Sequence, residues 1–203
     1  MNAQPFKETN SLKTKKVEVD SKMAYRLLHP RHTVLVSCRD KTGKANIITL
    51  AWTMPTSINP PMLVISISPK RYSHRIIEET GEFVVNVPTM NLAKQSLSCG
   101  RISGAKVDKF KKTKLTALPA KKVKSPIIKE CVAHLECKLT HKITTGDHTL
   151  FVGDVVAAYV KKGVFTETYD TTKVKPLFHI GGDSFVTISP EVVTPPRPRK
   201  IDN

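Results

Sequence analysis

The chain has 203 residues, of which 39% are hydrophobic and 25% charged, and its formal net charge is +16. This composition is typical of one folded globular domain and excludes collagen-like and intrinsically disordered chains. The longest apolar runs, such as residues 155–160, are too short to span a membrane. The N-terminus has lysines but no apolar stretch behind them, so it does not resemble a secretory signal. We therefore expect a cytoplasmic protein that does not associate with membranes.

Both ends of the chain are predicted to lie outside the folded domain. Residues 1–22 are polar and lysine-rich, without apolar periodicity, which predicts a loose arm. Residues 190–203 contain four prolines among charged side chains, which is typical of an extended tail. The domain should therefore occupy residues 23–189.

Runs of β-branched and apolar residues, separated by turn signals, predict most of the elements. The expected strands cover residues 33–39, 45–52, 62–68, 82–87, 131–143, 149–162 and 178–189. Two helices are expected between them. The first begins with Pro69, is capped by Ser68 and ends before Gly81. The second covers residues 91–98.

The order of these elements predicts the fold class. Strands outnumber helices, several neighbouring strands are linked as hairpins, and there is no regular alternation of strand and helix. A doubly wound parallel sheet is therefore disfavoured. The sequence predicts a mostly β protein, an antiparallel, Greek-key-like barrel with a few short helices.

The four cysteines form no CxxC pair and lie at no zinc-ligand spacing, so no metal site is expected. Cys131 and Cys137 are predicted to share one face of a strand, about 20 Å apart, too far for a disulfide bond. We expect all four cysteines to be reduced thiols that behave as small core residues.

Residues 106–124 concentrate positive charge. They contain eight lysines and a single acid, Asp108, which gives a local charge of 8 − 1 = +7. Such a segment can bind an anionic partner or a phosphate-bearing cofactor, or it can be a solvated loop that aids solubility. Only one aromatic residue, Phe110, lies among the lysines, which argues against nucleic-acid binding.

Several short motifs occur in an order that resembles the flavin reductase-like, FMN-binding split-barrel family, over residues 24–188. Each motif alone is weak, but the shared order is specific. The motifs are Asp40-x-x-Gly43, Asn46-x-x-Thr49-x-x-Trp52, Pro60-Pro61, Thr80-Gly81-Glu82-Phe83, Val85-Asn86-Val87, Ser103-Gly104 with Asp108-Lys109-Phe110, Gly146-Asp147-His148 and Pro176-Leu177-Phe178-His179. The resemblance implies an FMN-binding split β-barrel.

The resemblance places the FMN phosphate beside the segment that follows the third strand. Free backbone N–H groups and the helix dipole at a helix start favour an anion there. Arg71 adds a fork of donors, Lys70 a point charge, and Ser68 and Ser73 hydroxyl groups. In the alternative interpretation, Ser68 only caps the helix, while Lys70 and Arg71 face solvent.

The resemblance places the flavin ring along the second strand and its exit. Asn46, Thr49, Trp52 and Thr53 would supplement backbone amides along the ring edge. Thr49 can instead reflect β-propensity alone, and Trp52 can be a core or interface anchor. The remaining cofactor contacts expected from the family are Ser66 and Lys109.

His148 follows Gly146 and Asp147 in a turn that the resemblance places near the flavin and a nicotinamide donor. A histidine at this position can orient the donor or supply a proton, so His148 is the candidate catalytic residue. The alternative is an exposed turn histidine, with Asp147 serving the turn geometry.

The resemblance leaves two functions open. The first is an NAD(P)H-dependent flavin reductase, which needs no separate dinucleotide-binding motif; no G-x-G-x-x-G follows a strand. The second is a flavoredoxin-type FMN electron carrier, in which residues 106–124 would dock an acidic redox protein. A homodimer is expected in both cases, because an open barrel leaves apolar strand faces such as residues 151–159 for a second subunit to cover.

Overall fold

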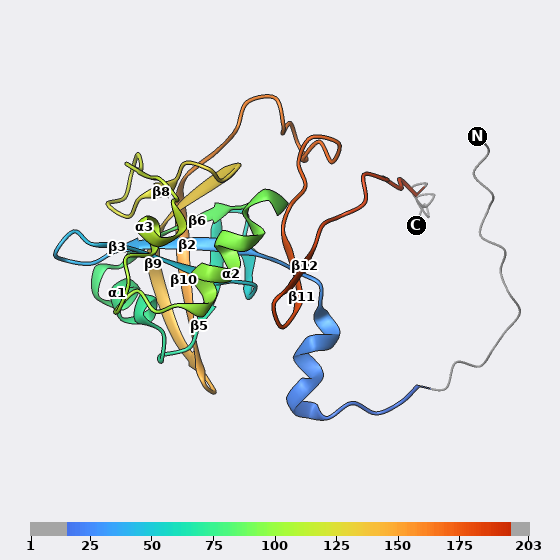
Figure 1. Ribbon diagram of the computed structural model, residues 1–203, viewed down its shortest axis with the longest axis horizontal. Coiled ribbons are helices and arrows are strands. Elements are labelled where there is room, and N and C mark those ends of the chain that lie inside the picture. The colour runs from blue at the N-terminus through green and yellow to red at the C-terminus, as the bar shows by residue number, and fades with distance from the viewer. Residues whose placement is uncertain (1–15, 196–203) are drawn as a thin grey trace, which may run out of the picture.

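The computed structural model describes residues 16–195, and the outer parts of the predicted arm and tail lie outside this range. Figure 1 shows a barrel of strands with α-helices around it, and a separate hairpin and an N-terminal helix to one side. The helices are η1 (Ser21–Leu28), α1 (Tyr72–Thr80), η2 (Met90–Leu92), α2 (Ala93–Arg101) and α3 (Lys109–Thr113). The strands are β1 (Arg31–His32), β2 (Val34–Arg39), β3 (Ala45–Leu50), β4 (Thr53–Ser57), β5 (Met62–Ile67), β6 (Glu82–Val87), β7 (Ala117–Leu118), β8 (Ile127–Ile128), β9 (Ala133–Thr145), β10 (His148–Val160), β11 (Phe178–Gly181) and β12 (Ser184–Val186).

The main sheet has seven strands in the order β3-β2-β6-β9-β10-β5-β4, and each neighbouring pair is antiparallel. The sheet curls until β3 packs near β5. No β3–β5 strand pairing occurs in the described chain, but the amide of Ser66 donates to the carbonyl of Trp52 at 3.0 Å beyond the end of β3. The barrel is therefore open along a seam between β3 and β5. The prediction of a mostly β, antiparallel barrel is confirmed.

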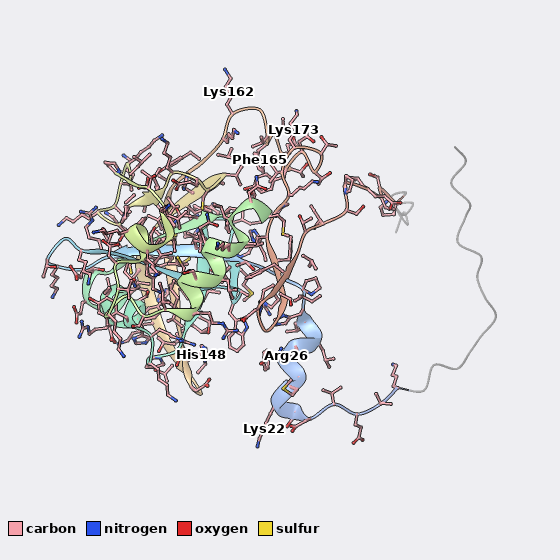
Figure 2. The ribbon with its side chains drawn as sticks, in the orientation of Figure 1. Lys22, Arg26, His148, Lys162, Phe165 and Lys173 are labelled. Carbon is pink, nitrogen blue, oxygen red and sulfur yellow. The ribbon has the colours of Figure 1, made fainter. Side chains whose placement is uncertain are left out.

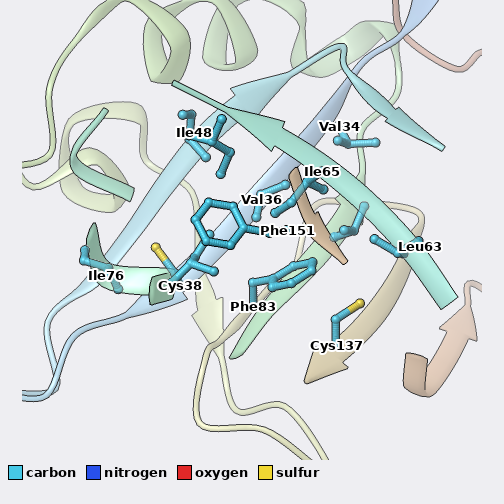
Figure 3. Packing of buried hydrophobic residues seen from close by; sticks show 13 residues of the cluster. Val34, Val36, Cys38, Ile48, Leu63, Ile65, Ile76, Phe83, Cys137 and Phe151 are labelled. Atoms are coloured by element: carbon cyan, nitrogen blue, oxygen red, sulfur yellow. The ribbon is translucent and has the colours of Figure 1, made fainter. Parts of the chain in front are cut away.

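Alternating side chains of the strands fill the barrel. Val34, Val36 and Cys38 of β2 point into it, and Phe83 and Phe151 meet near its centre (Figure 3). These residues are at most a few per cent exposed, so they form a close-packed core.

The residues of β2 and β3 that point out of the barrel are covered by helices. Leu35 and Ile47 pack against Cys99 of α2 and Phe110 of α3 in a second apolar cluster. This cluster fixes α2 and α3 against the outside of β3. The segment that joins the two helices therefore lies beside the seam.

The start of α1 differs from the prediction. Gly81 ends the helix as expected, with φ +70°, but the helix begins at Tyr72 and not at Pro69. The carbonyl of Ser68 accepts the amide of Arg71 at 2.9 Å, so residues 68–71 form a turn and Ser68 does not cap the helix. A proline fixes its own φ but does not oblige the next residues to be helical.

The cysteines are free and buried, as predicted, but two of them do not share a strand face. β9 begins only at Ala133, after a turn in which the amide of Cys131 donates to the carbonyl of Ile128 at 3.0 Å. Cys131 therefore packs in the cluster beneath α3, and Cys137 packs inside the barrel.

Part of the strand face predicted to contact a second subunit is covered by the chain itself, whereas Ala158 on this strand is exposed. Phe151 is fully buried in the barrel core, and Tyr159 packs against a loop that crosses β9 and β10. Exposed apolar side chains occur on η1, none of whose residues is buried, and also at scattered positions elsewhere, such as Met54, Ile58 and Ile143. Within residues 16–195, no helix is long and apolar enough to cross a membrane.

Candidate functional site

A cavity of about 410 Å³ lies on the seam of the barrel, a size typical of small-ligand sites. Residues of β3 and β5 form two of its walls, and the turn before α1 closes one end. The α2 helix, the segment after it and the β11–β12 hairpin form most of the rest, and Thr33, Lys109 and His148 complete the lining. Every residue predicted to contact the cofactor or the donor lines this cavity, except Thr53. Their contacts with a cofactor stay predictions.

One end of the cavity is cationic. Lys70 and Arg71 line it beside Ser68 and Ser73, and among residues 16–195 neither cation lies within 4 Å of a carboxylate. The N-terminus of α1, at Arg71, has no side-chain cap, so amide N–H groups of its first turn are free for a ligand. These features together suit a phosphate.

Asn46 joins the two sides of the seam. Its Nδ2 donates to the hydroxyl of Ser73 at 2.7 Å, which links β3 to α1. Its Oδ1 points toward Gly104, so closely that a Cβ built on Gly104 would lie 2.0 Å from it. Gly104 is therefore required for the close approach of its backbone to Asn46.

Several buried polar atoms of residues that line the cavity have no hydrogen-bond partner within the described chain. Among residues 16–195, five buried side-chain atoms lack a hydrogen bond, and three of them belong to cavity residues: Thr33 Oγ1, Asn46 Oδ1 and Ser96 Oγ. A buried polar atom without a hydrogen bond lowers the stability of the fold by about 1–3 kcal/mol. Unpaired atoms gathered on one cavity indicate a polar ligand that completes them. A flavin has alternating donors and acceptors on its ring edge and hydroxyls on its ribityl chain, so the residues present fit FMN.

Lys109 connects two elements of the cavity wall, a structural role that the sequence did not predict. Its ammonium donates to the carbonyls of Ile47 and Cys99, each at 2.6 Å, and so ties β3 to α2. Burial lowers the pKa of Lys109. Two of its three N–H donors are thus used by the protein, and one remains for a ligand.

Thr49 and Thr53 also donate to backbone carbonyls. The Thr49 hydroxyl bonds to the carbonyl of Ser96 at 2.6 Å, so β3 is linked to α2 through it. The Thr53 hydroxyl bonds to the carbonyl of Val64 at 2.8 Å, inside the β4–β5 pair, and Thr53 lies outside the cavity. Thr53 lines a second, smaller cavity of about 280 Å³, which shares Trp52, Ser66 and His148 with the first.

His148 and Trp52 form an aromatic pair at the mouth of the main cavity. Their ring centroids are 4.8 Å apart, and the ring of Tyr25 on η1 meets Trp52 edge-on, with a centroid distance of 5.7 Å. The Nδ1 of His148 lies 2.7 Å from a carboxylate oxygen of Asp147. Figure 2 shows His148 at the edge of the barrel, on the side nearer to η1. Because a carboxylate only accepts hydrogen bonds, Nδ1 is the donor in this contact with Asp147, and Nε2 is the ring nitrogen left for a ligand.

The last wall is the β11–β12 hairpin, to which the sequence analysis assigned no site residue. Arg101 of α2 pairs with Asp183 in the hairpin turn and donates to the carbonyl of Gly182 at 3.2 Å. The motif around His179 was recognised, but only the structure brings it to the cavity. Other lining residues without a predicted role are Thr33, Ser96, Arg101, Ser103, Gly104, Gly182 and Phe185.

The fold and the cavity define an antiparallel barrel with a polar ligand site on its open seam. Residues 25–184 match the model of the flavin reductase-like domain, so the chain belongs to the flavin reductase-like family. This extent confirms the resemblance seen in the motifs.

Individual relatives agree with this assignment. An uncharacterized protein of Archaeoglobus fulgidus is 41% identical over 170 residues, covering 83% of this chain and 94% of the relative. A flavin reductase of Pseudomonas putida is 30% identical over 128 residues, covering 63% and 71%. The crystal structure of a flavoredoxin from Methanosarcina acetivorans superimposes with a TM-score of 0.78 at 29% identity, covering 92% of this chain and 97% of that one.

Proposed function

We propose that this protein binds FMN in the seam cavity and is an NAD(P)H-dependent flavin reductase. The observation that supports it most is the cavity itself: a cationic end without carboxylate partners, continuous with a wall on which three buried polar atoms are unpaired. The similarity to a flavin reductase of Pseudomonas putida agrees with this activity.

The residues have distinct parts in the proposed reaction. Arg71, Lys70 and the first turn of α1 hold the phosphate, and Thr33, Asn46 and Ser96 complete the polar contacts. The bound flavin supplies the hydride-accepting chemistry. His148, held through Nδ1 by Asp147, presents Nε2 to the nicotinamide donor or to a proton in transit.

The second candidate is an electron carrier that exchanges electrons with a protein and does not react with nicotinamides. The similarity to a flavoredoxin supports it. The two candidates share the FMN site and differ in the electron donor, so direct reduction by NADH or NADPH separates them.

Replacement of Arg71 by alanine is expected to weaken FMN binding about tenfold to thirtyfold, because a charge-assisted bond to the phosphate is worth about 1.5–2 kcal/mol. Riboflavin has no phosphate, so its affinity should change less than about twofold on this reasoning. Fluorescence titration of both flavins measures the two losses. Arg75→Ala is the matched control, since Arg75 is two-thirds exposed on the same helix and pairs with Glu79. Equal losses for both flavins would exclude Arg71 from the phosphate site.

A homodimer is expected, with η1 covered by a second copy of the chain. Leu27 and Leu28 are 70% and 65% exposed, although neighbouring Tyr25 packs on the cavity residue Trp52. Such exposed apolar side chains are typical of subunit interfaces. Replacement of Leu27 by aspartate should shift the protein toward a monomer in light scattering. Val192→Asp, at an equally exposed position in the C-terminal segment, should leave the dimer intact. A monomeric wild type at micromolar concentration would contradict this proposal.

A further inference from the structure

Residues 106–124 present lysines in a fixed arrangement. All the lysines of this segment except Lys109 are exposed; we call these seven side chains the lysine face. The α3 helix explains why Lys109 alone is buried: Lys109 and Phe110 lie on its inner face, whereas Lys111 and Lys112 lie on its outer face. Figure 1 shows α3 beside β8 on the same side of the barrel. Phe110 and Ile128 pack in one apolar cluster, which joins them.

The carboxylates near the lysine face are used by backbone amides. Glu136 accepts the amides of residues 121, 122 and 123, at 2.6–3.2 Å. Glu82 accepts those of residues 124 and 125 at 2.7 and 2.8 Å. Asp108 caps α3, and Glu130 accepts the amide of Thr116. The loop is therefore held in one shape by acids that face its backbone.

The ammonium groups of the lysine face make no direct ion pair with these acids. In the described part of the chain, no ion pair within 4 Å involves any lysine of the face. One of them, Lys121, lies 4.5 Å above the ring of Tyr159. The result is a surface of net positive charge, on which seven lysines outnumber the four nearby carboxylates. Such a surface attracts an anionic partner over a distance of about one Debye length, ~10 Å.

We propose that the lysine face is the docking surface for a protein with an acidic surface patch. The segment contains lysines but no arginine between residues 102 and 130, and its one aromatic side chain, Phe110, is 9% exposed. Nucleic-acid surfaces ordinarily combine arginine forks with stacking aromatic rings. Point charges on a preorganised loop suit the carboxylates of a protein partner, where they set the association rate and the orientation.

The docking surface adjoins the seam cavity. Ser103 and Gly104 line the cavity, and the chain then passes directly to Lys106. Lys44, at the β2–β3 turn, donates to the carbonyl of Gly104 at 3.4 Å and adds positive charge at this edge. A protein docked on the lysine face would therefore lie beside the wall of the proposed flavin site. The docking itself does not depend on the proposed function, since the charges are present with or without flavin.

The test compares two triple variants that remove the same charge. Lys111→Gln, Lys112→Gln and Lys122→Gln neutralise the lysine face. Lys161→Gln, Lys162→Gln and Lys175→Gln are the control, because these lysines are exposed and lie outside the face; Figure 2 labels Lys162 on the excursion after β10. Equal melting temperatures of the two variants verify that both fold.

Binding is measured by calorimetry at low salt, with an acidic ferredoxin as the probe and a basic cytochrome c as the opposite-charge control. Flavin need not be bound, so failure of the proposed function leaves the test intact. The wild type should bind only the ferredoxin, and more weakly as salt rises. The affinity for ferredoxin should fall at least about fivefold in the lysine-face variant and less than about twofold in the control. These losses are modest because each exposed ion pair contributes little to the binding free energy.

Carbodiimide crosslinking locates the contact, because it forms an amide bond between a lysine Nζ and a partner carboxylate with loss of water. Crosslinks should map to Lys111, Lys112 and Lys122 and not to Lys161 or Lys162. Salt-independent binding, equal loss in both variants, or crosslinks outside the face would overturn the proposal. Tighter binding of duplex DNA than of ferredoxin, lost in the lysine-face variant, would assign the surface to nucleic acid instead.

Discussion

Replacement of His148 by alanine is expected to slow reduction of bound FMN by NAD(P)H about a hundredfold, while FMN affinity stays within about twofold. A positioned acid–base or orienting group typically contributes this factor, about 2.7 kcal/mol. FMN affinity should persist because the proposed phosphate contacts, Lys70 and Arg71, belong to a different segment of the cavity lining from His148. Stopped-flow reduction with each nucleotide gives the rate.

Asp147→Asn is the companion variant for His148. Asp147 is 91% exposed and contacts His148 Nδ1, and this contact lowers the pKa of Asp147. An asparagine at this position can accept the same hydrogen bond but carries no charge. If His148 acts through Nε2, Asp147→Asn should cause a smaller loss than His148→Ala and should change the pH profile of reduction. Fast reduction that both variants leave untouched would remove His148 from the reaction.

Replacement of Glu136 by glutamine is expected to destabilise the fold by about 3 kcal/mol. Glu136 is fully buried, and its carboxylate accepts three backbone amides and the hydroxyl of Tyr159. Bonds to a charged acceptor are about twice as strong as neutral ones, and a glutamine would turn an NH₂ group toward amide donors. Urea unfolding measures the loss. Glu130→Gln is the control, since Glu130 is exposed and holds a single amide.

The same residue gives the stability a pH dependence. Burial raises the pKa of Glu136, but the amides of Lys121 and Lys122 and the hydroxyl of Tyr159 more than offset this, so its pKa lies below the ordinary value of 4.5. A lowered folded-state pKa stabilises the fold above the unfolded pKa, and this contribution is lost as the pH falls through the folded pKa. Glu136→Gln should remove that part of the acid destabilisation. Parallel pH curves for wild type and variant would contradict the assignment.

The strands were predictable because their side chains follow the physics of a buried sheet. Val34, Val36 and Cys38 point into the barrel while Leu35 faces the helices, so β2 is buried on both faces and appears in the sequence as a continuous, mostly apolar and β-branched run. Gly81 marked a helix end because the left-handed cap favours glycine. Short elements such as α3 and β8 were not predicted. Packing of Phe110 of α3 and Ile128 of β8 in the cluster with Leu35 stabilises them more than local propensity does.

The cavity was only partly predictable, for a related reason. Lys70, Arg71 and His148 belong to local motifs. Such a motif can be recognised in the sequence because all of its residues lie within a few positions of one another. Thr33, Ser96 and Gly182 come from distant segments, and only the folded chain brings them to one cavity. The bracing bonds of Lys109 to Ile47 and Cys99 likewise depend on how α2 and α3 pack on β3. No spacing in the sequence indicates such contacts.

The proposal that the seam cavity binds FMN is tested most directly through Trp52, the only tryptophan of the chain, which lines that cavity. FMN should quench its fluorescence along a saturable curve that ends at one FMN per chain, because a bound flavin would lie against this ring. Riboflavin should quench it with weaker affinity, since it lacks the phosphate held by Lys70 and Arg71. Trp52 fluorescence that falls linearly with FMN concentration and shows no saturation would contradict an FMN site in this cavity.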